Sequence, residues 1–388
     1  MILLTAAGSF SWQALVCKMK KAIFFIGVLI AGASFGERSL KAGIDAFNAA
    51  VPQDSSNTLA FSPLAFELDC CVFAEALDPI GRANVSEKLS VKTDFDGAYA
   101  PIFESFGNMP ETNRIFFTSA RTIGVTDISK VNADFKRRVF EMSMNASISR
   151  IWPLKGAERW FQAKLDGWME DFVMPLGKLG SHQYSVVDAA VISAYLPDDA
   201  GCVPSEANFR LNGGELKKIP FITFQAKVDF RRNKESTFIR VPLRGESYLY
   251  LMMPTDEGNS LAPLRKKIAG DSIHALMLEP IDPNIKESGS EVCEISLPKF
   301  DFISTTNIAK SFDVLGIQEK ELLYLYPELI SRSAFQSVRF ILDKGNVPED
   351  LEPLSNATTK MTFNRPFLFF VHCPDSNTIP VIGQFTGE

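Results

Sequence analysis

The strongest hydrophobic pattern lies near the C-terminus. Residues 367–371 form an unbroken apolar run, with Pro366 before it and the polar stretch 374–377 after it. A short run of this kind, rich in β-forming residues, is typical of a strand buried on both faces. Proline cannot donate to a strand ladder, so Pro366 belongs at the start of the strand. A second apolar segment at residues 379–383 predicts a partner strand, and the two should form a buried hairpin through the turn at 374–377.

Apolar residues recur with helical or alternating spacing in the rest of the chain, which predicts a mixture of helices and strands. We expect helices at residues 40–50, 65–77, 132–141 and 157–173. We expect strands at residues 59–61, 120–125, 186–195, 238–243, 248–253 and 338–342. Ser62 and Pro63 would supply a side-chain N-cap and a first-turn proline for the second helix. The pair Asn212-Gly213 predicts a hairpin turn.

The first part of the chain has the order of a secretory signal peptide. Residues 18–21 contain three lysines, residues 22–31 are apolar, and small residues follow. We expect cleavage after Ala33 or Gly36, and the apolar run is too short to anchor the chain in a bilayer. Met19 suits the initiator position of such a peptide, so residues 1–18 are interpreted as a misassigned start. The chain is therefore divided into a signal peptide, residues 1–36, and one domain, residues 37–388.

Composition favours one large domain. The chain has 388 residues, of which 46% are hydrophobic and 32 are phenylalanine, and no linker-like tract or internal repeat interrupts it. The net charge is −6 without a long run of one sign. A protein with this charge lacks the basic surface that nucleic acid requires, so nucleic-acid binding is disfavoured.

The six cysteines match neither a zinc pattern nor a regular disulfide framework. They are Cys17, Cys70, Cys71, Cys202, Cys293 and Cys373. Signal cleavage would leave five of them, which we interpret as buried free thiols. A single long-range disulfide is the alternative in an exported protein.

The chain carries no recognisable catalytic constellation. Its three histidines, His182, His274 and His372, do not accompany a Gly-x-Ser-x-Gly elbow, and no phosphate-binding loop is present. His372 follows the buried strand and is interpreted as structural. We therefore expect a protein that is not an enzyme, with no catalytic residue, no metal and no cofactor.

A polar segment precedes the C-terminal hairpin and has no counterpart elsewhere in the chain. Residues 346–362 are acidic and rich in turn formers, and they show no periodicity. A loop of this length inside a compact domain is typically functional or disordered. Because it leads directly into a buried strand, we expect it to be functional.

Several motifs, taken in order, resemble the serpin family. Phe363-Asn-Arg-Pro-Phe-Leu-Phe-Phe370 resembles its C-terminal signature, and Asn57-Thr-Leu-Ala-Phe-Ser-Pro-Leu64 resembles its first conserved segment. Further similar landmarks are Trp168 with residues 175–179, residues 296–300, and residues 315–317. The resemblance covers about residues 38 to 386.

The resemblance implies an α+β serpin fold. Its helical N-terminal half packs on a large mixed β-sheet, two smaller β-sheets complete it, and the reactive-centre loop is exposed. The implied reactive-centre loop residues are Asn346, Pro348, Pro353, Leu354, Ser355, Asn356, Thr359 and Lys360. The implied hinge before the loop is Asp343, Lys344 and Gly345. The implied shutter cluster under the main sheet is Ser62, Ala65, Asp188 and Phe335, where a second Ser, an Asn and a His are usual for the last three.

The resemblance also implies a serine-type endopeptidase inhibitor that presents this loop as bait. The implied partner is an extracellular serine or cysteine protease. Neither nucleic acid nor, after signal cleavage, a membrane is expected as a partner, and we expect a secreted monomer.

The loop residues leave a second function open. The span from Gly345 to Phe363 is about four residues shorter than in inhibitory members, which removes about 13 Å of strand. Pro348 and Pro353 cannot donate ladder bonds, and the acids among residues 349–352 would place a charge on a buried face. The alternative is therefore a non-inhibitory serpin that acts as a binding protein or a simple protease substrate. Counting back from Phe363 places the scissile bond near residues 354–356, whereas counting forward from Gly345 places it near residues 359–360.

Overall fold

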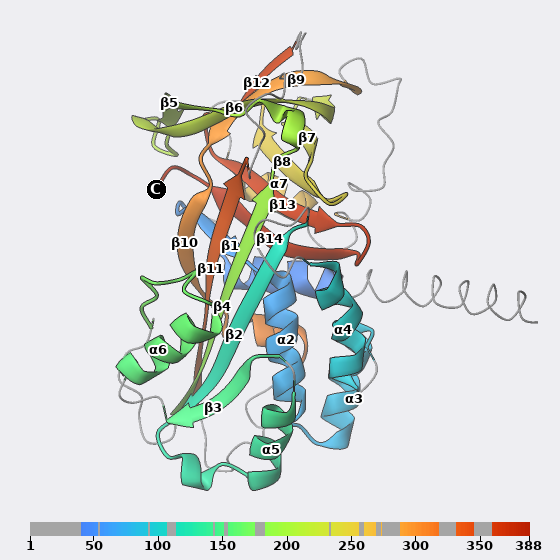
Figure 1. The fold of residues 1–388 in the computed structure, drawn as a ribbon, viewed down its shortest axis with the longest axis vertical. Coiled ribbons are helices and arrows are strands. Elements are labelled where there is room, and N and C mark those ends of the chain that lie inside the picture. Colours follow the sequence, from blue (N-terminus) through green and yellow to red (C-terminus); the bar gives the residue numbers. More distant parts are fainter. Residues whose placement is uncertain are drawn as a thin grey trace, which may run out of the picture.

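The computed structural model describes residues 40–52, 55–91, 94–106, 114–142, 144–150, 154–174, 183–232, 234–255, 260–268, 273, 288–317, 331–344 and 359–388. Two β-sheets and a set of helices make up this part of the chain (Figure 1). The predicted signal peptide, residues 1–36, lies outside the described residues. None of the described helices is long and apolar enough to cross a membrane.

The main sheet has five strands in the order β10-β11-β4-β2-β3. They are β10 (Asp301–Asn307), β11 (Ser331–Asp343), β4 (Gln183–Tyr195), β2 (Phe116–Val125) and β3 (Ala146–Arg150). β11 pairs with β10 in antiparallel fashion and with β4 in parallel fashion, and β4 pairs antiparallel with β2. The sheet is thus mixed, as predicted.

The second sheet has nine strands and follows the order β1-β14-β13-β8-β7-β6-β9-β12, with β5 paired to β6. Its strands are β1 (Leu59–Phe61), β14 (Thr378–Phe385), β13 (Phe367–Cys373), β8 (Tyr248–Pro254), β7 (Ser236–Pro242), β6 (Leu216–Arg232), β9 (Ser288–Pro298), β12 (Thr359–Thr362) and β5 (Val203–Arg210). The two smaller sheets expected from the sequence are joined here. The reason is that β6 is 17 residues long, so that it pairs with β5 and β9 in one part and with β7 at its end.

The helices lie on both faces of the main sheet and beside it. They are residues 40–50, α2 (Pro63–Ala74), α3 (Pro79–Leu89), α4 (Phe95–Ser105), α5 (Ala133–Glu141), α6 (Leu154–Lys164), α7 (Ala262–Lys267) and α9 (Ser311–Val314), with 3-10 turns at η1 (Ile128–Lys130) and η2 (Asp198–Ala200). Every residue of α2 is buried, because this helix runs between the main sheet and β14. α6 and the turns after it cover the other face of the main sheet. We call the side facing α2 the back face and the side facing α6 the front face.

The helix predicted over residues 157–173 is shorter than expected. α6 ends at Lys164, and Asp166 and Gly167 both have positive φ angles, 49° and 77°. Two consecutive left-handed residues cannot continue a right-handed helix. The segment therefore proceeds as turns to residue 171 and still packs on the sheet.

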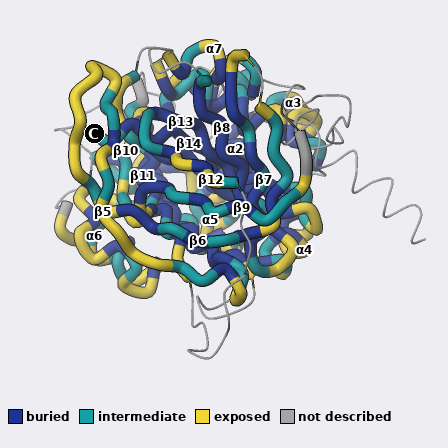
Figure 2. Tube along the Cα trace, turned by 90° about the horizontal axis from the view of Figure 1, so that it is seen from above, coloured by how far each residue is buried: buried dark blue, intermediate teal, exposed yellow. Residues whose placement is uncertain are grey.

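The C-terminal hairpin is the centre of the core, as predicted. All residues of β13 and β14 are buried, and they lie with α2 and β8 in the buried interior seen in Figure 2. Gly383 of β14 faces β1, where an added Cβ would lie 2.2 Å from the carbonyl oxygen of Leu59 and 2.5 Å from the ring of Phe369. Only glycine permits the two strands to approach this closely.

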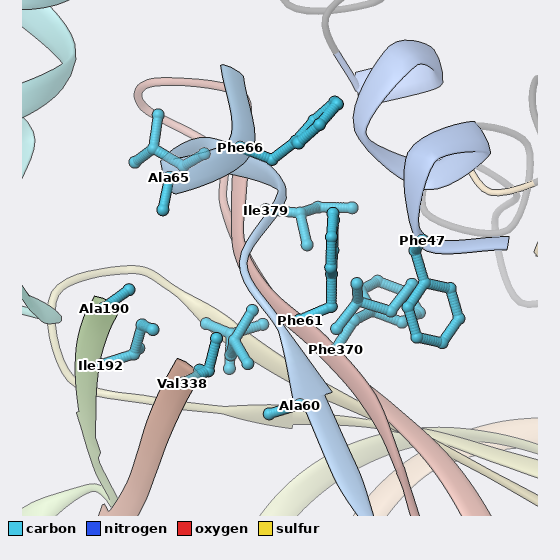
Figure 3. Packing of buried hydrophobic residues seen from close by; sticks show 14 of the residues in the cluster. Phe47, Ala60, Phe61, Ala65, Phe66, Ala190, Ile192, Val338, Phe370 and Ile379 are labelled. Atoms are coloured by element: carbon cyan, nitrogen blue, oxygen red, sulfur yellow. The ribbon is translucent and has the colours of Figure 1, made fainter. Parts of the chain in front are cut away.

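A cluster of phenylalanines connects the two sheets. Phe340 of β11 stacks on Phe369 of β13, with ring centroids 5.4 Å apart, and Phe300 contacts both. Nearby, Figure 3 shows Val338 of the main sheet between Ala190 of the same sheet and Ala60 of β1. Since the two sheets share these side chains, they form one core.

We expect Phe367→Asp to abolish folding. Phe367 is fully buried and stacks on Phe385 at 5.6 Å, so a carboxylate there would lack any partner, at a cost of more than about 4 kcal/mol. Phe140→Asp is the matched control, because Phe140 on α5 is 88% exposed. Its effect should stay within about 0.5 kcal/mol. Soluble yield and thermal melting measure both variants, and a cooperatively melting Phe367→Asp protein would contradict this placement.

Candidate functional site

The line along which β4 and β11 pair is the unusual feature of the main sheet. The two strands pair in parallel over their whole length, from Gln183 opposite Ser331 to Tyr195 opposite Asp343. Each also has an antiparallel neighbour on its outer side, β2 for β4 and β10 for β11. We call this line the seam, and the end at Tyr195 and Asp343 its upper end.

A polar cluster lies under the seam on the back face. Gln336 of β11 accepts from the backbone N–H of Ser62 at 2.7 Å and donates to the Ser62 carbonyl at 3.1 Å and to Asp188 Oδ2 at 2.9 Å. Ser62 is the N-cap of α2 and accepts from the Ala65 N–H at 3.2 Å. All four residues are fully buried. The cluster therefore connects both strands of the seam to the start of α2.

The structure brings together Ser62, Ala65 and Asp188 but not Phe335, and in this respect the sequence-based cluster was wrong. Successive strand residues point to opposite faces. Gln336 therefore faces α2, whereas its neighbour Phe335 lies on the front face and is half-buried. Gln336, the residue after Phe335, makes the polar contacts of this cluster.

Asp188 belongs to a buried group of charges that extends across β2. Arg121 of β2 donates from Nε to Asp69 Oδ1 at 3.0 Å, and its Nη2 lies 3.6 Å from Asp188 Oδ1. The guanidinium also donates to Ser119 Oγ at 2.7 Å and to the Met144 carbonyl. Asp69, Arg121 and Asp188 are each at most 2% exposed. One guanidinium thus serves two buried carboxyl groups.

This imbalance changes the titration of both acids. Burial raises the pKa of Asp188 to about 6, against the lowering effects of Arg121 and the Gln336 hydrogen bond. Burial, followed by the negative charge of Asp188, raises the pKa of Asp69 well above its usual range. A second carboxylate beside one arginine is costly when both are ionised. The pair therefore binds a proton at a higher pH than ordinary carboxyl groups do.

The front face of the seam is covered by α6 and the turns that follow it. Phe161 of α6 and Met169 pack on Val187 and Ala189 of β4. Arg339 of β11 then holds this cover from the other strand, donating to the Trp168 carbonyl at 2.6 Å and pairing with Asp301 at 3.0 Å. The covering segment is consequently attached to both strands of the seam.

The predicted hinge residues lie at the upper end of the seam. The Asp343 carbonyl accepts from the Leu196 N–H at 2.9 Å, and the Lys344 N–H donates to Asp343 Oδ1 at 2.6 Å. Both hinge residues are exposed. Gly345, the third predicted hinge residue, lies outside the described residues.

The predicted loop residues divide into two groups. Asn346, Pro348, Pro353, Leu354, Ser355 and Asn356 lie outside the described residues. Thr359 and Lys360 belong to β12, where they pair with Cys293 and Glu294 of β9, and Lys360 Nζ lies 2.8 Å from Glu294 Oε1. A peptide bond held in a strand is a poor protease substrate because the protease must bind it as an extended, free segment.

Within the part of the chain that the structure describes, no group of His, Cys, Asp and Glu side chains could hold a metal. His372 is buried, with Nε2 3.2 Å from Asn377 Oδ1, as a structural histidine would be. The five described cysteines are free, and all except Cys202 are buried. The site is thus a closed seam between two strands, with a hinge at one end.

Comparison with known proteins agrees with this geometry. A family model described as Serpin (serine protease inhibitor) matches residues 41–320, which is more than half of the chain. The chain belongs to the serpin family.

A solved structure shows the same fold. The crystal structure of native protease nexin-1 with heparin matches at a TM-score of 0.71 and 15% sequence identity, covering 92% of this serpin and 99% of that chain. At this identity the likeness carries the fold alone. No curated protein matches the sequence.

Sequence reasoning missed four polar residues around the seam of this serpin. Gln336 crosses the seam, Arg339 holds its front cover, Arg121 pairs with Asp188 beside it, and Arg244 lies at its upper end. Arg121 and Asp69 had a usable signal. Arg121 is the one charge in an apolar strand, Asp69 lies with Glu67 in an otherwise apolar helix, and a buried charge requires a partner. Arg244 had none, since arginine in a turn is ordinarily exposed.

We expect Asp188→Asn to raise the free energy of unfolding at pH 7.5. For a carboxyl group with a raised folded pKa, the stabilising contribution is present below the unfolded pKa of about 4 and is lost as the pH rises through about 6. Asparagine removes that loss and leaves Arg121 paired with Asp69. The gain should be on the order of 1–3 kcal/mol at pH 7.5 and should vanish toward pH 4.

Urea unfolding at several pH values between 4 and 8 measures this difference. Asp134→Asn is the control, because the Asp134 side chain on α5 is 75% exposed. An Asp188→Asn protein that is less stable than the parent at pH 7.5 would show that Asp188 is stabilising in its ionised form.

Proposed function

We propose that this chain is an exported protease inhibitor that offers residues 346–358 as bait to a serine or cysteine protease. The observation that carries the proposal is the parallel pairing at the seam. A strand that left β11 at its upper end and turned back between β11 and β4 would run antiparallel to both. Antiparallel pairing is slightly more stable per residue than parallel pairing. Cleavage of the bait would free such a strand to insert.

The position of β12 favours cleavage upstream of it. Because Thr359 and Lys360 already pair with β9, the bait consists of the residues between Lys344 and β12. We place the scissile bond within residues 354–356. About ten residues would then remain attached to β11, or about 33 Å of extended strand, against about 43 Å for the thirteen-residue seam. Insertion would therefore fill most of the seam.

The side chains of the bait oppose this insertion. Glu349 and Asp350 are adjacent, so one of them must face the back side of the sheet, where the seam is lined by apolar residues such as Ala190 and Val338. Pro348 and Pro353 would each leave a ladder acceptor without a donor, at about 1–3 kcal/mol each. These costs make insertion slow or incomplete, so that some encounters with a protease would end in simple cleavage.

The prolines and acids of the bait also favour a second function. If the costs exceed the gain, the protein would act as a non-inhibitory serpin that binds a partner or is merely cut. Export is proposed in either case, on the signal-like order of residues 18–36. A secreted monomer is the corresponding form.

We expect a covalent complex, resistant to SDS, with at least one protease from a panel of trypsin-like, chymotrypsin-like, elastase-like and papain-like enzymes. Cleaved protein should accompany it, and mass spectrometry should place the cut within residues 354–356. The same proteases with blocked active sites serve as controls. Cleavage by the panel without any complex would favour the second function.

If the second function holds, loop cleavage alone should raise the melting temperature by only a few degrees. A protease that is not the target can be used to nick the loop between residues 351 and 358, and the nicked and intact proteins can be compared by calorimetry. The variant Pro348→Thr/Pro353→Ala restores two ladder donors, so its nicked form should gain more than the nicked parent does. A nicked parent that melts tens of degrees above the intact protein would show that the prolines and acids do not hinder insertion.

A further inference from the structure

We propose that Arg244 is a clamp on the upper end of the seam and that it controls how readily the hinge separates from β4. This proposal concerns the regulation of the seam and rests on the proposed function for its biological meaning. Its physical basis is a set of contacts that connects Arg244 to both strands. Arg244 would be a positioning residue, since it acts through the backbone of the hinge.

Arg244 contacts the ends of both strands at once. Its backbone N–H donates to the Tyr195 carbonyl at 3.0 Å, and its Nε donates to the Leu196 carbonyl at 3.0 Å, both at the end of β4. Its Nη2 donates to the carbonyl of Lys344, the residue after β11, at 3.1 Å. The same nitrogen pairs with Asp198, and the guanidinium carbon lies 6.0 Å from the centre of the Tyr195 ring.

The turn that carries Arg244 holds it in place. Arg244 lies between β7 and β8, where Gly245 and Glu246 have φ angles of 71° and 57° and the Leu243 N–H donates to the Ser247 carbonyl at 2.8 Å. Two consecutive left-handed residues are typical of a tight hairpin turn that matches the twist of its strands. Because β8 pairs with the buried β13, this turn is attached to the core as well as to the end of β4.

Opening the seam must break this arrangement. An inserting strand would start between Leu196 and Lys344, so their two carbonyls would have to move apart. Arg244 cannot follow both, and its side chain is only 10% exposed. A cationic donor that loses a carbonyl acceptor in a partly buried place forfeits a charge-assisted bond, one of the stronger kinds of hydrogen bond. The clamp therefore stabilises the closed upper end relative to the open one.

Cys202 provides a local reporter of this opening. It is half-buried and lies close enough to Lys344 and Asp343 for their charges to influence the pKa of its thiol, which burial raises. The other described cysteines are buried. Displacement of the hinge should expose the Cys202 thiol, and the rate of its reaction with a thiol reagent should follow the opening of the upper end.

The test compares Arg244→Gln with the parent in the absence of any protease. We expect hydrogen exchange to accelerate about tenfold or more in peptides that contain Leu196 and residues 340–344, because local opening no longer breaks a charge-assisted bond. The Cys202 thiol should react faster by a similar factor. Peptides from β13 and β14 should exchange as in the parent.

Arg240→Gln is the matched control. Arg240 lies on β7 four residues before Arg244, pairs with Asp229 and stacks over Tyr248 at 5.0 Å, but it makes no contact with the seam. The Arg240→Gln variant should lower the overall stability without a selective change of hydrogen exchange near Leu196.

Two further variants grade the effect. Asp198→Asn, at a position where the side chain is 53% exposed, should accelerate hydrogen exchange less than Arg244→Gln does. Arg244→Lys should partly restore protection from exchange. Equal exchange patterns in Arg244→Gln and Arg240→Gln, or unchanged Cys202 reactivity, would overturn the clamp.

These readouts separate the clamp from the proposed function. If Arg244→Gln loosens the upper end but neither it nor the parent forms a covalent complex with any protease, the clamp stands and the inhibitory proposal fails. If the parent forms complexes and Arg244→Gln leaves local exchange unchanged, the inhibitory proposal stands and the clamp fails. If both hold, the fraction of protease that becomes trapped should rise in Arg244→Gln.

Discussion

The parallel pairing of β4 with β11 is the constraint on which the rest of the structure depends. Its register decides which residues face α2 and which face α6. A shift of one strand by one residue would move either Asp188 or Gln336 to the front face, so that the two side chains would no longer meet. The apolar residues of the shifted strand would then face the wrong helix. The polar cluster on the back face and the covering helix on the front face are therefore compatible with only this register.

Polar side chains cross and flank the seam in addition to its apolar packing, whereas the two sheets are joined by apolar contacts. Gln336 crosses it on the back face, Arg339 holds its front cover and Arg244 lies at its upper end. The phenylalanine cluster around Phe300 and Phe369 keeps the two sheets together. Polar contacts can be exchanged for others when strands separate, but a buried apolar cluster cannot be opened without a large loss of burial. In the proposed mechanism, this division would let the sheet open locally while the core persists.

The seam and the loop have opposite effects on the free energy of inserting the loop as a strand. The seam is arranged so that one more strand would be antiparallel to both of its neighbours, which favours insertion. The loop carries two prolines and several acids, which a central strand accommodates poorly. The outcome depends on the difference between these two free energies. Small changes in either, such as a proton on the Asp69 and Asp188 pair or the loss of one clamp, would therefore have a large effect on the fate of a cleaved molecule.

The sequence by itself determined those elements that a local pattern of residues is sufficient to predict. The buried hairpin followed from the apolar run at residues 367–371, the start of α2 from Ser62 and Pro63, and the family from ordered motifs. Local patterns suffice here because burial on both faces, capping and turn formation depend on nearby residues. The end of α6 was misplaced because the apolar spacing continues through turns that still pack on the sheet.

Only the tertiary structure decided which residues close the seam. Gln336, not its neighbour Phe335, meets Asp188, and this depends on the strand's alternation relative to a helix that lies 274 residues earlier in the chain. Arg244 contacts a carbonyl 100 residues away. Such partners are set by the packing of elements that are distant in the sequence. The residues that flank a polar side chain therefore do not indicate which group it will bond.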